Sequence, residues 1–260
     1  MVVNYGGAPI VAPALRERPL ERHTEAITFV EGLVRGAFDM VVLMTGVGTR
    51  ALVAVADHLV PRTRFVEALG STRVVARGPK PMAALRELGL GAWAVAPEPN
   101  TWREVLSALE ARAAELTWRG LRVAVQEYGT PNVQLNAALE ARGAIVTSVP
   151  IYRWTLPDDV EPLRQGIRAI VNDGVDVVLL TAGVQMVHLL EVAASMGLEH
   201  EVRQHLRKAV VASIGPIASE VLRQQGLSID LEPSHPKMGF LVKEVAERCG
   251  PMLEAKQCVQ

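Results

Sequence analysis

The strongest constraint on this chain is a similarity between two parts of its sequence at a constant spacing. Identical residues recur 137 positions later at many sites, among them Asp39 and Asp176, Gly46-Val47 and Gly183-Val184, Gly78-Pro79 and Gly215-Pro216, Leu85-Arg86 and Leu222-Arg223, and Gly89-Leu90 and Gly226-Leu227. Because the spacing is constant, neither copy has an insertion relative to the other over the matched residues. Solenoid repeats usually have periods of about 20 to 50 residues, so this longer period predicts two similar domains. Unrelated βα units can share such patterns by chance, but chance does not explain the fixed register.

Short apolar runs alternate with amphipathic stretches through the more complete copy. The apolar runs predict buried strands at residues 40–44, 73–76, 92–95, 122–126 and 145–148. The amphipathic stretches predict helices at residues 49–60, 80–88, 101–114 and 132–142. This alternation is typical of an α/β fold in which helices cover both faces of a parallel sheet. The sequence therefore predicts two similar doubly wound, flavodoxin-like, parallel-sheet domains.

The other copy has fewer strands of its own. It predicts strands at residues 177–180, 209–213 and 228–231, and helices at about residues 185–196, 217–225 and 239–248. Residues 7–11 resemble residues 143–146, so we expect a fourth strand at residues 7–11. In the more complete copy, a strand and a helix at residues 121–142 precede the equivalent strand. We therefore expect that the first domain is truncated at its N-terminus, that it lacks about 25 residues of an interior strand and a helix, and that the gene starts upstream.

Two crossings join the predicted domains, at residues 12–17 and 149–155. The prolines at or near these crossings favour extended strands over helices, namely Pro13, Pro19, Pro150 and Pro157. We expect the crossings to form a two-strand connector. The predicted boundaries are a discontinuous domain of residues 1–17 plus 153–260 and an inserted domain of residues 18–152.

The composition is that of a globular protein, with 49% apolar and 21% charged residues. A net charge of −1 gives no basic field that would attract nucleic acid, so we expect no nucleic-acid partner. No apolar run approaches the roughly 20 residues that span a bilayer, and no signal-peptide pattern is visible. We therefore expect no membrane association and a cytoplasmic location. Cys249 and Cys258 lack the spacing of metal ligands, and we expect both to be reduced and no metal to be bound.

Five segments in order resemble the uroporphyrinogen-III synthase family: VVLMTGVGTRAL around residues 42–52, VVARGPKPMAALRELGL at 74–90, VPIYRWTLP at 149–157, DVVLLTAGV at 176–184 and SIGPIASEVLRQQGL at 213–227. The likeness covers nearly the whole chain from Ala8. It implies a monomeric lyase that closes the linear tetrapyrrole hydroxymethylbilane into uroporphyrinogen III, inverting the last pyrrole ring and releasing water. It also implies that no metal or organic cofactor is needed, and that the substrate lies in a cleft between two doubly wound domains.

Four loops that follow strands and open helices are the candidate substrate-binding segments, at residues 45–48, 77–80, 181–184 and 213–217. Free amides and the helix dipole at such positions favour carboxylates, and this substrate carries eight. The candidate binding residues are Thr45, Gly46, Val47, Gly48, Arg77, Gly78, Lys80, Thr181, Ala182, Gly183, Val184, Ser213, Gly215, Pro216 and Ile217. The alternative interpretation is that these loops are ordinary βα turns.

Tyr152 matches the connector tyrosine of the family, so the resemblance implies that its phenol assists the loss of water. The alternative is a packing aromatic beside Trp154. Tyr128 and Lys237 are further candidate binding residues, each open to a purely structural or solvated alternative. His188 lies in an apolar helix, and we expect a structural role for it.

The sequence departs from the family pattern in two places. Pro81 and Ala218 stand where a hydroxyl residue is common after the loop glycine, with Ser219 next along, which weakens any role for a hydroxyl there. The family's early arginine-bearing segment is also missing, which argues against activity of the chain as it stands.

Two other functions compete with this interpretation. Residues 46–51 fit the dinucleotide fingerprint GxGxxG/A, and Glu67 follows about twenty residues on, but no strand is predicted before Glu67. The second alternative is a non-catalytic tetrapyrrole-binding or sensory module on the same fold.

Overall fold

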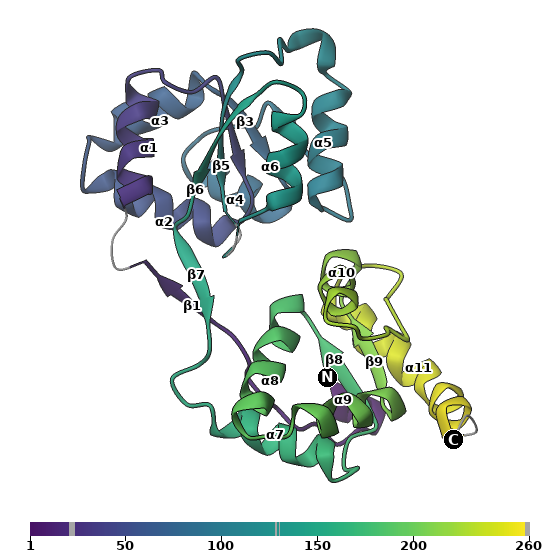
Figure 1. Cartoon of the computed structure of the whole chain (residues 1–260). Helices are drawn as coiled ribbons and strands as arrows, with labels where there is room; N and C mark the ends of the chain where they lie inside the picture. The colour runs from purple at the N-terminus through teal and green to yellow at the C-terminus, as the bar shows by residue number, and fades with distance from the viewer. Residues whose placement is uncertain (21–23, 128, 130, 258–260) are drawn as a thin grey trace. The chain divides into compact units, whose positions relative to one another are not determined.

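The computed structural model describes residues 1–20, 24–127, 129 and 131–257. The chain divides into two compact units (Figure 1). Unit 1 combines Met1–Arg16 with Thr155–Gln260, and unit 2 is Glu17–Trp154. At the two chain crossings, strand β1 (Arg16–Pro19) pairs with strand β7 (Tyr152–Thr155) in a two-stranded sheet.

Unit 2 is built on a five-stranded parallel sheet. Its strands are β2 (Met40–Leu43), β3 (Arg73–Ala76), β4 (Ala94–Val95), β5 (Arg122–Gln126) and β6 (Ile145–Val149). The spatial order is β4-β3-β2-β5-β6. Counted with β5 as the first strand, this is the order 2-1-3-4-5 of flavodoxin-like sheets. The carboxyl ends of all five strands therefore lie at one edge, where such sheets carry their ligand sites.

Helices cover both faces of this sheet because the strand side chains alternate between two apolar clusters. Val41 and Leu43 face one cluster, and Met40 and Val42 face the other. The first cluster is covered by α1 (Thr24–Val34), α2 (Gly46–Asp57), α3 (Arg62–Gly70) and α4 (Pro79–Glu87). The second is covered by α5 (Trp102–Glu110) and α6 (Val133–Glu140), which lie together on one side of the sheet in Figure 1. A short turn, η2 (Ala113–Glu115), follows α5.

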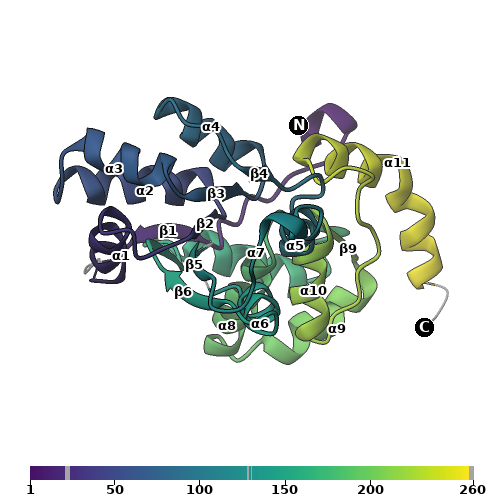
Figure 2. The same ribbon diagram turned by 90° about the horizontal axis from the view of Figure 1, so that it is seen from above.

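Unit 1 is also an α/β unit, with a smaller parallel sheet. Strand β8 (Val177–Leu180) pairs with β9 (Val210–Ser213), and an isolated parallel bridge joins Ala212 to Leu231. Its helices are α7 (Glu161–Val171), α8 (Gly183–Ser195), α9 (Glu199–Lys208), α10 (Pro216–Gln224) and α11 (Met238–Gln257). The first turn of the chain, η1 (Val2–Tyr5), lies against α11 (Figure 2).

The 137-residue spacing of the sequence also relates the elements of the two units. Strands β2 and β8, strands β3 and β9, and helices α1 and α7 begin and end at positions with this spacing. The bridge between Ala212 and Leu231 is the counterpart of the pairing between Val75 and Ala94. The sequence repeat is therefore a repeat of backbone structure, down to single residue pairs.

The predicted strand at residues 7–11 is wrong, because these residues are irregular. Ile10 and Val11 are 54% and 76% exposed, so the segment buries no apolar face. The equivalent strand in unit 2, β6, is held by β5, and no described residue of unit 1 forms a counterpart of β5. Pro9 also has no N–H to donate to a neighbouring strand. The predicted strand at 228–231 is likewise reduced to the single bridge at Leu231.

Candidate functional site

The N-terminus of α2 forms the centre of the candidate site in unit 2. Thr45 follows β2 in an extended conformation and caps the helix, its Oγ1 accepting a hydrogen bond of 3.0 Å from the Gly48 amide. Threonine is favoured at this position because its oxygen satisfies an amide that the first helical turn leaves without a partner. The Thr45 carbonyl in turn accepts a bond of 2.7 Å from the Thr49 hydroxyl. The loop is therefore fixed by its own side chains.

Gly46 brings two of the predicted loops together. A Cβ atom at Gly46 would lie 2.6 Å from the carbonyl oxygen of Lys80, so only glycine permits this approach of the 45–48 and 77–80 loops. The Arg77 amide donates to the Leu43 carbonyl at 3.0 Å, which continues the pairing of β2 and β3 into these loops. Both loops thus start from the carboxyl edge of the sheet.

Tyr152 lies beside this helix terminus. It is 5% exposed and packs with the cluster formed by α1 to α4. Its hydroxyl lies 3.3 Å from Oγ1 of Thr45, and either hydroxyl can be the donor. Thr45 Oγ1 already accepts from the Gly48 amide, so its own proton can be donated to the phenol oxygen. With Thr45 as the donor, the phenol oxygen is the acceptor of this bond.

Gln126 is a buried polar residue beside Thr45 that the sequence analysis did not single out. It ends β5, is 1% exposed, and its Oε1 accepts a hydrogen bond of 3.1 Å from the Thr45 amide. Its Nε2 donates to the carbonyl of Glu127. The available signal was a pair of polar residues, Gln126 and Glu127, directly after a run of buried apolar residues at a strand end.

Glu127 is a buried carboxyl group at the same sheet edge. It is 5% exposed, and its amide donates to the Val149 carbonyl at 3.1 Å. Burial raises the pKa of the Glu127 carboxyl above its ordinary value, a hydrogen bond with Ser148 opposes this rise in pKa, and the charge of Glu25 adds to it. The group is therefore protonated to a larger extent than an exposed glutamate.

A cavity of about 380 Å³ opens along one side of α2 in unit 2. It is lined mainly by residues of α2, together with Ile151 and Tyr152. Its lining residues are Glu17, Val47, Ala51, Ala54, Val55, His58, Ile151 and Tyr152. Most of this surface is apolar, which suits a ring system better than a carboxylate.

The corresponding loops of unit 1 are also held by side chains. Oε1 of Gln185 accepts from the amides of Thr181 and Ala182, at 2.8 and 3.0 Å. The Ser213 hydroxyl is fully buried and lies 2.5 Å from the hydroxyl of Ser219. The Ile214 amide donates to Leu180 at 2.8 Å, so the 181–184 and 213–217 loops start side by side.

The other predicted residues differ in their accessibility. Val47, Lys80, Thr181 and Lys237 are exposed, Arg77, Ala182, Val184, Pro216 and Ile217 are half-buried, and Gly48, Gly78, Gly183 and Gly215 are buried. Tyr128 lies outside the described residues. The ring of His188 is buried, and its Nδ1 lies 2.6 Å from the carbonyl oxygen of Ala14, which is a structural contact as expected.

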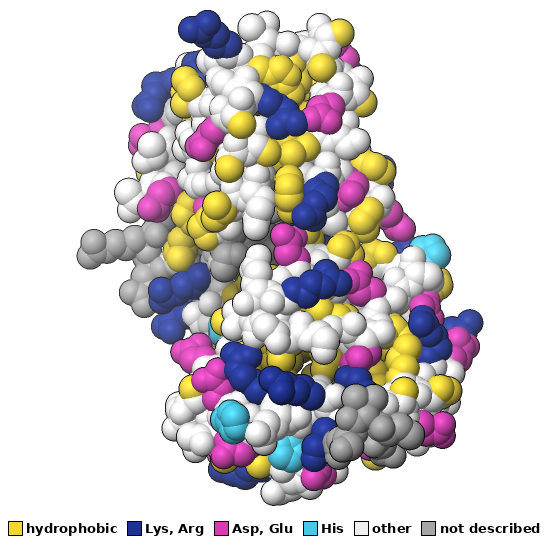
Figure 3. Space-filling view, turned by 45° about the vertical axis from the view of Figure 1, so that its right-hand side comes forward, with side chains coloured by type: hydrophobic (Ala, Val, Ile, Leu, Met, Phe, Trp, Pro, Cys, Tyr) yellow, Lys and Arg dark blue, Asp and Glu magenta, His cyan; other side chains and the backbone are white. Residues whose placement is uncertain are grey.

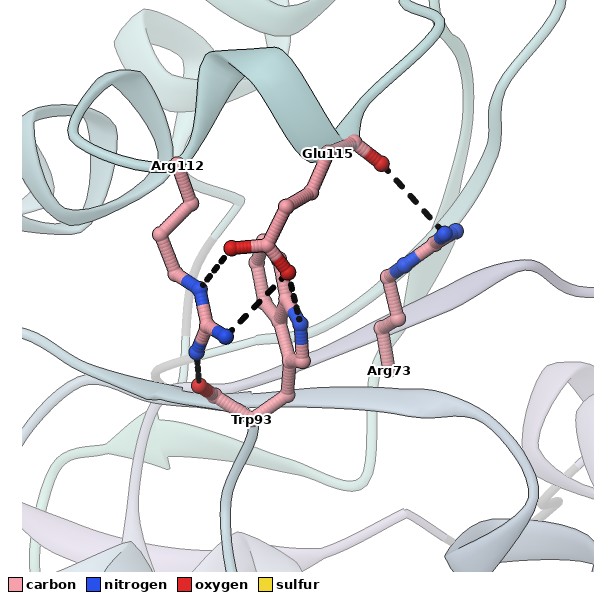
Figure 4. Close-up of polar contacts among 4 residues, drawn as sticks. All are labelled: Arg73, Trp93, Arg112 and Glu115. Carbon is pink, nitrogen blue, oxygen red and sulfur yellow. Dashed lines mark hydrogen bonds and ion pairs between the residues drawn. The ribbon is translucent and has the colours of Figure 1, made fainter.

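A second cluster of charged and aromatic side chains lies at the opposite edge of the unit 2 sheet, where β3 begins (Figure 4). The guanidinium of Arg112 lies 4.2 Å from the ring centre of Trp93 and donates to Glu115 at 2.8 Å. The Trp93 indole donates to Glu115 at 3.3 Å, and Arg73 donates to the Glu115 carbonyl at 3.4 Å. Arg112 holds the pKa of the Glu115 carboxyl below its ordinary value. These groups bind one another, so we assign the cluster a structural role.

Charged side chains of both signs are interspersed on the face of the molecule seen in Figure 3. Within the described residues, no three His, Cys, Asp or Glu side chains gather so that they could hold a metal ion. No helix formed by the described residues is both long and apolar enough to cross a bilayer. Glu67, the acidic residue that a dinucleotide site would need after a strand, lies exposed in α3.

Comparison with known proteins identifies the family. The model for uroporphyrinogen-III synthase HemD matches residues 2–243. The chain belongs to the uroporphyrinogen-III synthase family. Membership supports an enzyme of heme biosynthesis, and the solved structures of this family agree with the parallel α/β architecture described above.

Several individual proteins are similar to this chain over most of its length. A mutant uroporphyrinogen III synthase from the extremely thermophilic bacterium Thermus thermophilus is 26% identical with a TM-score of 0.65, covering 98% of this chain and 91% of that chain. The wild-type enzyme from the same organism is 25% identical with a TM-score of 0.52, covering 95% and 90%. The synthetase of Helicobacter pylori 26695, at 13% identity and a TM-score of 0.50, shares the fold over 90% of this chain and 89% of its own. A Bacillus subtilis (strain 168) protein named "Uncharacterized protein YjjA" is 29% identical over 253 residues, covering 95% of this chain and 89% of its own.

Proposed function

We propose that this protein is a uroporphyrinogen-III synthase, a lyase that converts hydroxymethylbilane into uroporphyrinogen III and water. The observation that carries the proposal is the family match over residues 2–243. Tyr152 adds a chemical argument, because its hydroxyl lies beside the capped N-terminus of α2 and the residue also lines the cavity. We also propose, from the family, a monomer in the cytoplasm that uses no cofactor.

The first task of such an enzyme is to fix a flexible chain of four pyrroles so that its two ends meet. We propose that the helix N-termini that follow β2, β3, β8 and β9 take substrate carboxylates, since the positive end of each helix dipole favours anions there. Arg77, Lys80 and Lys237 would add charge-assisted hydrogen bonds. Holding the reacting ends in place can supply a large part of the rate increase, because it removes the entropic cost of their encounter.

The second task is to release water from the terminal hydroxymethyl group. In the proposed step, the C–O bond breaks as the pyrrole nitrogen lone pair moves into the ring system, and Tyr152 gives its proton to the departing hydroxyl. The resulting electrophilic azafulvene is attacked by the substituted carbon of the last ring, which gives a spiro intermediate. In that intermediate the bond from the same ring carbon to its original methylene bridge breaks, and the released methylene bonds to the unsubstituted α-carbon of the ring, so the ring is inverted. The proton lost from that carbon restores the phenol of Tyr152. The net change is the loss of one water molecule.

The test is the isomer formed from hydroxymethylbilane, because this substrate also closes spontaneously, but to the uninverted type I product. A synthase is expected to give mainly type III product at a rate proportional to enzyme concentration. Type I product alone, together with saturable binding of the tetrapyrrole, would instead identify the non-catalytic binding module. A titration with NAD and NADP is expected to give no heat at millimolar ligand, and micromolar affinity would contradict the proposal.

A further inference from the structure

Gln126 connects the sheet of unit 2 to the loop that contacts Tyr152. Its Oε1 accepts from the amide of Thr45 at 3.1 Å, and Thr45 Oγ1 lies 3.3 Å from the Tyr152 hydroxyl. Three side chains from β5, the α2 N-terminus and β7 thus form one hydrogen-bonded series. All three are at least nine-tenths buried, so their bonds are not weakened by exchange with water.

Gly48 provides the space for this contact. A Cβ atom at Gly48 would overlap Nε2 of Gln126, which excludes any other residue at this position while the glutamine keeps its place. Glycine is a poor helix former compared with alanine, so a glycine here agrees with a close packing contact. The side chain of Gln126 makes that contact.

The repeat provides an internal comparison for this arrangement. Positions 48 and 185 are equivalent at the 137-residue spacing, and so are Thr45 and Ala182. In unit 1 the glutamine stands at position 185, and its Oε1 accepts from the Ala182 amide at 3.0 Å. In unit 2 the same acceptor reaches the Thr45 amide from a neighbouring strand, through the space left by Gly48. In both units a glutamine Oε1 therefore accepts from the equivalent backbone amide, although the glutamine lies on the helix in unit 1 and on strand β5 in unit 2.

We propose that Gln126 is a positioning residue for the synthase reaction, which holds the backbone of Thr45 so that the Thr45 hydroxyl keeps the phenol of Tyr152 in place. This inference rests on the proposed function of Tyr152. Gln126 acts through Thr45, so its loss should slow water release more than it weakens substrate binding. A misplacement of about 1 Å in a reacting group can cost about 100-fold in rate.

The first experiment compares Gln126→Ala with Val125→Ala, which shortens a fully buried side chain of the same strand that faces the other cluster. We expect kcat for type III product to fall by at least about tenfold in Gln126→Ala while KM changes less than about threefold. Val125→Ala should lower the melting temperature without a comparable fall in kcat. Equal effects of the two variants on kcat would overturn the proposal, because Gln126 would then contribute stability alone.

The second experiment transfers the arrangement of unit 1 into unit 2. The double variant Gln126→Ala with Gly48→Gln places a glutamine at the position equivalent to Gln185, from which its Oε1 can reach the Thr45 amide. We expect it to recover most of the kcat lost in Gln126→Ala. A folded double variant that keeps the KM of the unaltered protein but recovers no kcat would show that the acceptor at the Thr45 amide is not what matters.

A third measurement is independent of activity. The protein has three tyrosines, so the ¹³Cζ signal of Tyr152 in labelled protein can be assigned as the one absent from Tyr152→Phe. We expect this signal to shift or broaden in Gln126→Ala and to be unchanged in Val125→Ala. An unchanged signal in Gln126→Ala would refute the positioning role. Absence of type III product from the unaltered protein would instead refute the proposed function, while this signal still tests the contact.

Discussion

At the residue scale, the proposed chemistry depends on one hydroxyl group. Replacing Tyr152 by phenylalanine removes the group that lies 3.3 Å from Thr45 Oγ1 and keeps the ring that packs in the core. We expect the rate of type III formation to fall by about 10²- to 10⁴-fold, the range typical of lost acid assistance. The melting temperature should change little, because one hydrogen bond contributes only about 1 kcal/mol net.

The matched control for this variant is Tyr5→Phe, which removes a hydroxyl from an exposed residue of η1. It should leave both the rate and the melting temperature unchanged. A Tyr152→Phe protein that formed type III product at the original rate would leave Tyr152 with a packing role only.

Glu127 is predicted to make stability fall as the pH rises. Burial raises its pKa in the folded protein above the ordinary value of 4.5. At pH values between 4.5 and the pKa in the folded protein, the folded state therefore binds more protons than the unfolded state. Stability from this group is therefore present below pH 4.5 and lost as the pH rises through the folded pKa. Replacing Glu127 by glutamine should reduce this decline, measured as the difference in unfolding free energy between about pH 4.5 and pH 8. A decline of the same size in the variant would show that other groups cause it.

At the element scale, Asp39 and Arg122 tie the start of β2 to the start of β5. The Asp39 carboxylate accepts from the Arg122 amide at 2.9 Å and from two guanidinium nitrogens at 2.9 and 2.7 Å. These bonds hold the pKa of Asp39 below its ordinary value of 3.8. The resulting stability is present above that value and lost as the pH falls through the folded pKa, the opposite sign to Glu127.

We therefore expect Asp39→Asn to lower the unfolding free energy at pH 7 by roughly 1 kcal/mol, a modest value because the pair is partly exposed. The difference from the unaltered protein should shrink toward pH 3, as measured by urea unfolding at both pH values. Glu67→Gln, at an exposed position of α3, is the control and should change the unfolding free energy much less. A constant difference at all pH values would contradict the assigned cause.

At the scale of the whole molecule, unit 2 holds a complete hydrophobic core. Both clusters that cover its sheet consist of residues between 26 and 154, and β1 pairs with β7 at its two chain ends. We expect a fragment of residues 17–154 to fold alone and to unfold cooperatively in urea, as followed by circular dichroism. A fragment of residues 155–260 should be less stable than the fragment 17–154. It lacks Ala14, which in the whole chain packs in the core of unit 1 and whose carbonyl accepts from His188. A gradual, non-cooperative transition of the 17–154 fragment would contradict this prediction.

Local sequence patterns predicted most of the strands of unit 2, because a fully buried strand of a parallel sheet is a continuous apolar run. The observed β3 and β5 have the predicted bounds, and β2 and β6 differ by one residue. Helices α1, α3, α7 and α9 were not predicted. Helix α9 is strongly polar, and α3 buries only Phe65 and Leu69, so neither gives a long apolar stripe.

Residue periodicity and glycines at fixed spacing were enough to predict the repeat, the α/β class and the loops that open α2, α4, α8 and α10. The residues that meet at those loops could be identified from the folded chain alone. The contact of Gln126 with Thr45 joins residues 81 positions apart, and Tyr152 reaches Thr45 across 107 positions. Local patterns also could not show that residues 7–11 are not a strand, because a strand forms only where a neighbouring strand can pair with its backbone groups. Local patterns record which residues prefer to be buried, whereas the choice of partner depends on how separate elements pack.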